Sequence, residues 1–259
     1  MKVITVLCSK GGVGKTTTSA ALISGLTSKG YKTVGIDLDA QRNLSMTMQA
    51  DTKHKTALGV LTNQCTAIEA IQHTAQGDII AAGKELAAID SILTGRGREN
   101  RLKESLQPLE RQYKYVIIDT PPNVGTLVLS ALIASNSIII TAEADIYSRT
   151  ALEDLIENIQ AVQDGLNPKL TVEGILLTRY AGRANLTKYL REEFKEPAAE
   201  LNTKVFNSTI RECIAVKEAH LMRESIFDYE NGKSNAAIDY EAFIDELLTD
   251  NKKTKKGRG

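Results

Sequence analysis

The chain has 259 residues, which suits one large domain or two small ones and is enough for a sizeable core. Hydrophobic residues make up 42% of it, which excludes a disordered chain, and 32 basic residues balance 32 acidic ones. The formal charge of zero argues neither for nor against a nucleic-acid partner, so binding of that kind would need a local basic patch.

The cysteines and the hydropathy of the chain indicate in which cellular compartment the protein is expected. The three cysteines are widely spaced, so neither a disulfide framework nor a zinc site is favoured, and a reducing, cytoplasmic location follows. The N-terminus lacks the layout of a signal peptide, and no apolar run approaches the roughly 18 residues that span a bilayer. We therefore expect no membrane partner.

Short β-branched runs alternate with helix-like stretches along the chain. The predicted strands are Lys2–Leu7, Lys32–Leu38, Asp78–Ala82, Tyr115–Asp119, Ser137–Ala142 and Val172–Thr178. The predicted helices are Thr16–Lys29, Asn100–Gln112, Thr150–Gln163 and Lys233–Asp250. Most of the strand runs are apolar without alternation, as in strands that helices cover on both faces. The order predicts an α/β fold with a doubly wound, mostly parallel sheet flanked by helices.

The pattern changes after Thr178. Residues 179–223 carry few strand signals and many basic residues. Residues 251–259 are rich in Lys and Arg and have no apolar residue, so we expect a basic disordered tail there. No repeat or clear linker divides the rest, and residues 1–250 are predicted to form a single domain.

A glycine-rich loop follows the first predicted strand and opens the first helix, which is the context that a phosphate-binding loop requires. Its glycines let the backbone turn tightly and bring N–H groups against phosphate oxygens, and the helix N-terminus adds a positive dipole. Lys15 would reach the β- and γ-phosphates, and the Thr16 hydroxyl would bind Mg²⁺. The predicted nucleotide-binding residues of this loop are Lys10, Gly11, Gly12, Val13, Gly14, Lys15, Thr16 and Thr17.

Two acidic residues stand at the ends of predicted strands. Asp39 follows Leu38, and Asp119 ends the strand that begins at Tyr115. Ligands of an open α/β sheet bind at the carboxyl ends of strands, so both carboxylates should lie beside the phosphate loop. We assign Asp119, Asp39 and Thr16 to magnesium binding. The alternative is that each aspartate is a helix N-cap.

The loop departs from the ordinary GxxxxGK[ST] pattern in an informative way. Ser9 stands where that pattern has its first glycine, and a second lysine, Lys10, begins the loop. The run Lys-Gly-Gly-Val-Gly-Lys-Thr-Thr resembles the deviant Walker A box of the ParA/MinD group of ATPases, and the resemblance covers nearly the whole chain up to the tail. It implies a P-loop NTPase fold, ATP and Mg²⁺ as cofactors, and a homodimer in which Lys10 reaches the phosphates bound by the other subunit. Lys10, Lys15 and Asp39 are then the catalytic residues.

The second motif of the family is altered in this chain. ParA-like proteins usually read Asp-Pro-Gln-Gly-Asn, and this chain reads Asp39-Ala40-Gln41-Arg42-Asn43. In the family this aspartate positions or activates the attacking water. The absence of Pro makes the loop less stiff, and Arg42 in place of Gly restricts the backbone. A nucleotide-gated scaffold that hydrolyses ATP poorly therefore stays open as an alternative.

The C-terminal half resembles the ParA branch, the partition ATPases of plasmids and chromosomes. The strand that ends at Thr178 and the stretch Arg211–Ala219 look like those of that branch. The family's base pocket uses this region, so the resemblance suggests Thr178 and Arg211 near the adenine. It also implies a bacterial, nucleoid-associated ATPase, weakly active alone, whose ATP dimer binds nonspecific double-stranded DNA and is released through hydrolysis stimulated by a ParB-like partner.

Basic side chains after Thr178 are the candidates for DNA contacts, which a protein of this kind makes to phosphates only. They are Arg179, Arg183, Lys188, Lys217 and Arg223, with Arg211 as a further possibility. Acidic residues are interleaved among them, so the segment is only modestly basic. A solvated surface charge is the alternative for each.

Two other branches of the family make different demands. A MinD-like ATPase, a spatial regulator at the membrane, needs a C-terminal amphipathic helix with basic and bulky apolar faces, whereas the last predicted helix here is acidic. An electron-transfer ATPase like the nitrogenase iron protein needs paired cysteines for a shared cluster, and the cysteines here do not match. The sequence favours DNA partitioning, with the MinD-like regulator as the alternative.

Overall fold

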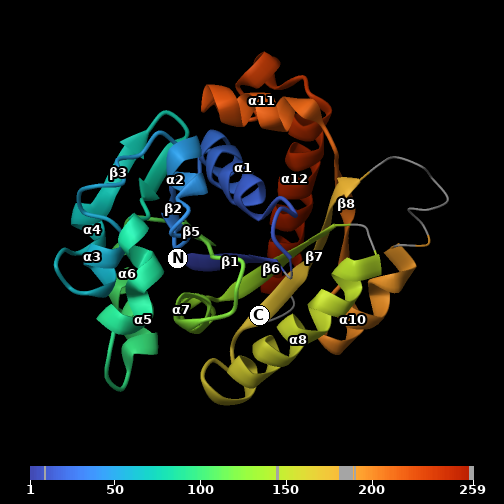
Figure 1. The fold of residues 1–259 in the computed structure, drawn as a ribbon. Coiled ribbons are helices and arrows are strands. Elements are labelled where there is room, and N and C mark those ends of the chain that lie inside the picture. Colours follow the sequence, from blue (N-terminus) through green and yellow to red (C-terminus); the bar gives the residue numbers. More distant parts are fainter. Residues whose placement is uncertain (9, 144–145, 181–188, 190, 257–259) are drawn as a thin grey trace.

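A computed structural model describes residues 1–8, 10–143, 146–180, 189 and 191–256 of the chain, and Figure 1 shows its fold. The strands are β1 (Lys2–Cys8), β2 (Thr33–Asp37), β3 (Ile71–Thr74), β4 (Gly77–Ile80), β5 (Tyr115–Asp119), β6 (Ser137–Glu143), β7 (Thr171–Tyr180) and β8 (Val205–Arg211). The α-helices are α1 (Lys15–Ser28), α2 (Asn43–Thr47), α3 (Ala57–Leu61), α4 (Ala67–Ala70), α5 (Ile89–Ile92), α6 (Arg101–Leu106), α7 (Thr126–Ala134), α8 (Ile146–Gly165), α10 (Lys195–Glu200), α11 (Ile214–Met222) and α12 (Asn235–Lys256).

Within the described residues the strands form one eight-stranded sheet in the order β3-β4-β2-β5-β1-β6-β7-β8. Its neighbouring strands are parallel, apart from the antiparallel pair of β3 and β4. The inner strands are apolar along both faces because helices cover each face. This confirms the predicted α/β fold with its doubly wound, mostly parallel sheet.

The side chains of β1 show how the two faces are covered. Ile4 and Val6 point into a buried cluster built with α1, α11 and α12, whereas Val3 and Leu7 point into the clusters that α3 to α8 and α10 build on the opposite face. Figure 1 shows α1 and α12 on one side of the sheet and α7 and α8 on the other. Successive side chains of β1 therefore pack alternately into the hydrophobic cores on the two faces of the sheet.

Two edge strands are absent from the sequence-based prediction. β3 pairs with β4 at one edge of the sheet, and β8 pairs with β7 at the other. Residues 179–223 carried few strand signals, and β8 was not among the predicted strands. This strand buries Phe206 and Ile210 but leaves its polar middle partly exposed, so it lacks the continuous apolar run that marks an inner strand.

The last helix also ends later than predicted. α12 continues to Lys256, so the expectation of a disordered tail from Asn251 is wrong for residues 251–256. Lysine is a good helix former, and positive charge is favourable near a helix C-terminus, so a basic run can extend the helix. Residues 257–259 lie outside the described part of the chain. None of the described helices is long and apolar enough to cross a membrane.

Three neighbouring strands bring the predicted site residues to one edge. β2, β5 and β1 lie side by side, and the register pairs Asp37 of β2 with Asp119 of β5 and Asp119 with Val6 of β1. The carboxyl ends of these parallel strands therefore meet where β1 enters the phosphate loop. This is the edge at which open α/β sheets bind their ligands.

Candidate nucleotide-binding site

The phosphate loop joins β1 to α1 in a backbone conformation that depends on glycine. Gly12 and Gly14 have φ angles of 82° and 77°, in the left-handed region that L side chains rarely adopt. Gly14 is the N-cap of α1, so the first N–H groups of this helix are open to a ligand. Lys10 and Gly11 are exposed, whereas the Val13 side chain is buried, so Val13 offers a ligand only its backbone.

Lys15 and Asp119 form a buried charge pair beneath the loop. Lys15 Nζ lies 3.2 Å from Asp119 Oδ1 and also donates to the Thr120 carbonyl. Burial acts to lower the pKa of Lys15, but the Asp119 carboxylate outweighs it and raises this pKa. The Asp119 carboxylate also accepts hydrogen bonds from Thr16 Oγ1 at 2.8 Å and Ser19 Oγ at 2.9 Å. One carboxylate therefore fastens α1 to the end of β5.

Asp37 is a further buried carboxylate at this edge, and the family motifs did not single it out. Its Oδ1 accepts from the Asp39 N–H at 3.0 Å, and its Oδ2 accepts from the Ser45 N–H at 2.8 Å and the Ser45 hydroxyl at 2.7 Å. Burial, and then repulsion from Asp119, raise the pKa of Asp37 to about 7. Asp37 thus ties the segment that carries Asp39 to α2. Its position at the very end of β2 was the available signal.

Asp39 lies in the segment between β2 and α2. Its side chain is buried, and its Oδ1 accepts from the Gln41 N–H at 2.9 Å. Arg42, the N-cap of α2, has φ 60° and ψ 28°, so it adopts the left-handed conformation that the glycine of the family motif would adopt more easily. The altered motif therefore places a residue with a side chain at a backbone conformation that favours glycine.

Two adjoining cavities lie over the loop. The phosphate cavity, of about 620 Å³, brings together Lys15, Thr16 and Asp39 with residues of α2 and α11. The base cavity, of about 240 Å³, is lined by Thr178 and Arg211 with further residues of α11. The two cavities share four lining residues, which are Gly12, Gly14, Thr17 and His220.

Thr178 and Arg211, which the resemblance suggested near the adenine, both line the base cavity, but their polar groups are engaged within the protein. The Thr178 hydroxyl is buried 2.9 Å from the Val13 carbonyl and 3.2 Å from the Ala142 carbonyl. The Arg211 guanidinium forms a two-point ion pair with Asp239, with Nε to Oδ2 at 2.8 Å and a terminal nitrogen to Oδ1 at 2.7 Å. Thr178 therefore buttresses the phosphate loop, and Arg211 joins the end of β8 to α12.

Known proteins are similar to this chain over nearly its whole length. A family model described as an AAA domain matches residues 1–172. The chromosome partitioning protein ParA of Myxococcus xanthus is 32% identical over 252 residues, which cover 95% of this chain and 88% of that protein. The sporulation initiation inhibitor protein Soj of Bacillus subtilis is 32% identical over 243 residues, which cover 92% and 94%. The chain belongs to the ParA/MinD family of P-loop ATPases.

A solved structure supports the same assignment. The protein described as cobyrinic acid a,c-diamide synthase from Mycobacterium smegmatis, with bound ATP analog and magnesium, is 29% identical to this ParA/MinD-type chain. The match has a TM-score of 0.83 and covers 96% of this chain and 94% of that chain. The ligands of that protein agree with ATP and Mg²⁺ as the predicted cofactors.

The predicted DNA-contacting residues fall into three groups in this member of the ParA/MinD family. Arg183 and Lys188 lie outside the described residues. Arg179 lies 3.3 Å from Glu212 and 3.9 Å from Glu143, so neighbouring carboxylates balance its charge. The remaining two residues have exposed side chains: Lys217 lies on α11, and Arg223 is the C-cap of that helix.

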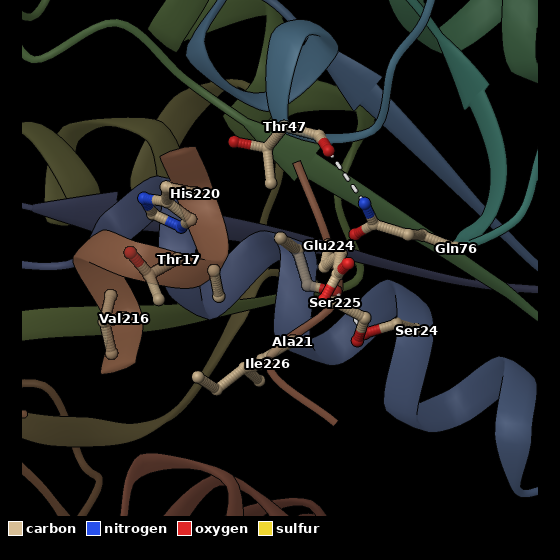
Figure 2. Close-up of a pocket in the computed structure, with 12 residues that line it drawn as sticks. Thr17, Ala21, Ser24, Thr47, Gln76, Val216, His220, Glu224, Ser225 and Ile226 are labelled. Carbon is tan, nitrogen blue, oxygen red and sulfur yellow. Dashed lines mark hydrogen bonds between the residues drawn. The ribbon is translucent and has the colours of Figure 1, made fainter. Parts of the chain in front are cut away.

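A small cavity behind the site is lined by residues of two walls of the phosphate cavity and by Gln76, which joins them (Figure 2). Gln76, in the turn between β3 and β4, donates from Nε2 to the Thr47 carbonyl at 2.7 Å and to the Arg223 carbonyl at 3.0 Å. Thr47 ends α2, and Arg223 is the left-handed C-cap of α11, with φ 56°. Gln76 therefore links α2 to α11. No motif could reveal this residue, because it acts on backbone carbonyls of distant segments.

Proposed function

We propose that the phosphate cavity binds MgATP and that the protein hydrolyses it to ADP and phosphate. The observation that carries this proposal is the meeting of Lys15, Thr16 and Asp119 within hydrogen-bond distance at the N-terminus of α1. Backbone N–H groups of the loop and the first turn of α1, including Thr17, face phosphate oxygens. Lys15 exchanges its bonds to β5 for bonds to the β- and γ-phosphates. Asp39 orients the attacking water.

The oxygen atoms at this point fit Mg²⁺. Thr16 Oγ1 and Asp119 Oδ2 are hard donors 2.8 Å apart, and Asp39 lines the same cavity as Thr16. Bound Mg²⁺ neutralises charge on the phosphate oxygens. Phosphate release measured with MgATP, and with ATP plus a chelator, tests this part. Hydrolysis that persists without divalent cation contradicts it.

The proposal includes a homodimer that forms with ATP. It is supported by Lys10, which stands exposed at the start of the loop where a second subunit could approach. Light scattering of the Asp39→Ala variant with MgATP, in which hydrolysis is blocked, should give the mass of two chains. Adding Lys10→Ala to that variant should return the monomer. A monomer in both proteins contradicts the dimer.

We further propose that the ATP dimer binds double-stranded DNA without sequence preference and that a ParB-like partner releases it by stimulating hydrolysis. The similarity to ParA and the exposed Lys217 and Arg223 support this reading. Gel shifts on unrelated DNA fragments should show binding with MgATP that weakens steeply with salt. Equal binding with ADP, or with no nucleotide, contradicts the partition function.

The MinD-like alternative receives little support from α12. Its bulky apolar side chains Tyr240, Phe243, Ile244 and Leu247 are buried in the core, so they do not form a free apolar face. We expect no ATP-dependent sedimentation with vesicles that contain anionic lipids. Cosedimentation that requires ATP would instead support the membrane regulator.

The slow-scaffold alternative is favoured by one observation, the left-handed backbone of Arg42. A side chain at such a position costs about 1 kcal/mol relative to glycine, and this cost can change when the neighbouring Asp39 responds to nucleotide. Arg42→Gly should therefore change the rate of ATP hydrolysis. An unchanged rate would remove the reason to expect slow switching from this residue.

A further inference from the structure

His220 occupies a position that the function proposed above leaves unused. It lies in the last turn of α11, and it lines both the phosphate cavity and the base cavity. Of the four residues that the cavities share, Gly12, Gly14 and Thr17 belong to the phosphate loop and α1, and His220 stands across from them on α11. Figure 2 shows the His220 and Thr17 side chains near each other at one end of the small cavity behind the site.

The order of groups in a nucleotide indicates what lies at this junction. If ATP binds as proposed above, the loop and α1 fix the triphosphate at one end, and the adjoining cavity beside Thr178 and Arg211 is the space left for the base at the other end. The sugar connects the two, so it must pass the place where the two cavities meet. His220 is the side chain that α11 presents at that place.

The imidazole has the chemistry to bind a sugar hydroxyl. Within the described part of the chain, no side chain or backbone group forms a hydrogen bond with it. Burial lowers the pKa of His220, which favours the neutral ring at neutral pH. A neutral imidazole has one donor and one acceptor nitrogen, and a hydroxyl can serve as partner to either.

We propose that His220 forms a hydrogen bond with a ribose hydroxyl and thereby makes the site selective for ribonucleoside over deoxyribonucleoside triphosphates. This inference rests on the proposed binding of ATP. It assigns a role in specificity to a side chain that belongs to neither the phosphate loop nor the acidic strand ends. A site whose polar group is made to bind a substrate hydroxyl rejects the analogue that lacks it, because the polar group is then left without its partner.

The experiment combines a substitution at His220 with the removal of one ribose hydroxyl from the nucleotide. Binding of ATP, 2′-deoxy-ATP and 3′-deoxy-ATP, each with Mg²⁺, is measured by calorimetry for the wild type and for His220→Ala. The wild type should bind ATP roughly 3- to 10-fold more tightly than at least one deoxy analogue, as expected for one hydrogen bond. In the variant this preference should fall to about 1-fold, because the partner of the hydroxyl is gone.

Two further variants separate a contact with the sugar from a structural effect. His220→Gln retains a side-chain donor of similar reach and should restore part of the preference. Met222→Ala changes an exposed residue two positions along α11 that lines neither cavity, and should leave the preference unchanged.

The outcomes distinguish this inference from the proposed function. If ATP itself does not bind to the wild type, the proposed function fails first. If ATP binds and His220→Ala weakens all three nucleotides by the same factor, His220 contacts the phosphates or the base and the inference is overturned. If the wild type shows no preference among them, the inference is overturned as well.

Discussion

The two sides of the nucleotide cavity are built in different ways. On the phosphate side, Lys15, Asp37 and Asp119 are buried, and each is held by several hydrogen bonds from neighbouring elements. On the α11 side, Leu221 is 80% exposed and Arg211 holds a partly exposed ion pair. Charges are costly to bury unless they are paired, so the phosphate side can exist only as a complete set of contacts.

The difference predicts where substitutions have large effects. A buried charged group that loses its partner keeps the full cost of its burial, whereas water replaces a lost partner at the surface. Changes on the phosphate side should therefore alter both stability and chemistry. Changes on the α11 side should alter affinity and selectivity while the fold persists.

Lys15→Ala should have the largest effect on activity. It removes the ammonium that we propose neutralises the phosphates, so we expect ATP hydrolysis to fall by about 100-fold or more, as for other groups that stabilise developing charge. Phosphate release under saturating MgATP measures it. Lys29→Ala is the matched control, because Lys29 follows the same helix and pairs with Asp245 near the surface. Equal rates for the two variants would contradict the assignment of Lys15.

Asp37→Asn should lower the free energy of unfolding by about 1–3 kcal/mol near neutral or lower pH, because the new amide faces the Ser45 N–H as a second donor. Urea unfolding measures the change. Asp228→Asn, at an exposed position, is the control and should be nearly neutral. An Asp37 variant as stable as the wild type would contradict the role assigned to this carboxylate.

The same variant tests the pH dependence of the phosphate side. The pKa of Asp37 is raised from 3.8 to about 7, so the folded state binds this proton more tightly than the unfolded state. Its contribution to stability is complete below about pH 4 and is lost as the pH rises through about 7. The destabilisation by Asp37→Asn should therefore be smaller at about pH 8 than at about pH 5. A difference that grows with pH would show the opposite sign for the pKa shift.

Gln76→Ala should have an intermediate effect, because Gln76 joins the two sides from behind. Losing its two hydrogen bonds to backbone carbonyls should cost about 1–2 kcal/mol of unfolding free energy. Gln72→Ala is the matched control, since Gln72 lies on the same hairpin and its side chain bonds only to the Asp51 backbone among the described residues. Equal losses of unfolding free energy for the two variants would show that Gln76 contributes no more than another polar side chain of the hairpin, and would contradict its role in linking α2 to α11.

Arg211→Ala should have the smallest effect on stability. Its ion pair with Asp239 has good geometry but is 40% exposed on the arginine side, so we expect a loss of about 1 kcal/mol or less. Thermal unfolding at low and high salt measures it, and the loss should shrink as salt increases. A larger loss of stability that does not depend on salt would show that the ion pair of Arg211 behaves like the buried contacts of the phosphate side.

The sequence predicted the parts of this site that depend on local pattern. The phosphate loop, the strand that ends at Asp119 and the parallel sheet could be inferred because glycine spacing and apolar runs have direct physical causes. The contacts of Gln76 could not be inferred, since they depend on where α11 ends. For Asp37 the end of β2 was a signal, but its contacts with Ser45 and its repulsion from Asp119 depend on which segments are neighbours. β8 was missed because an edge strand with a polar middle has no clear pattern.

Calorimetric titration of MgATP into the wild-type protein tests the central claim most directly. The structure predicts binding of one nucleotide per chain, a loss of affinity when Mg²⁺ is chelated, and a further loss in Lys15→Ala. Binding of the same strength in all three titrations, or no binding to the wild type, would contradict the assignment of this cavity as the MgATP site.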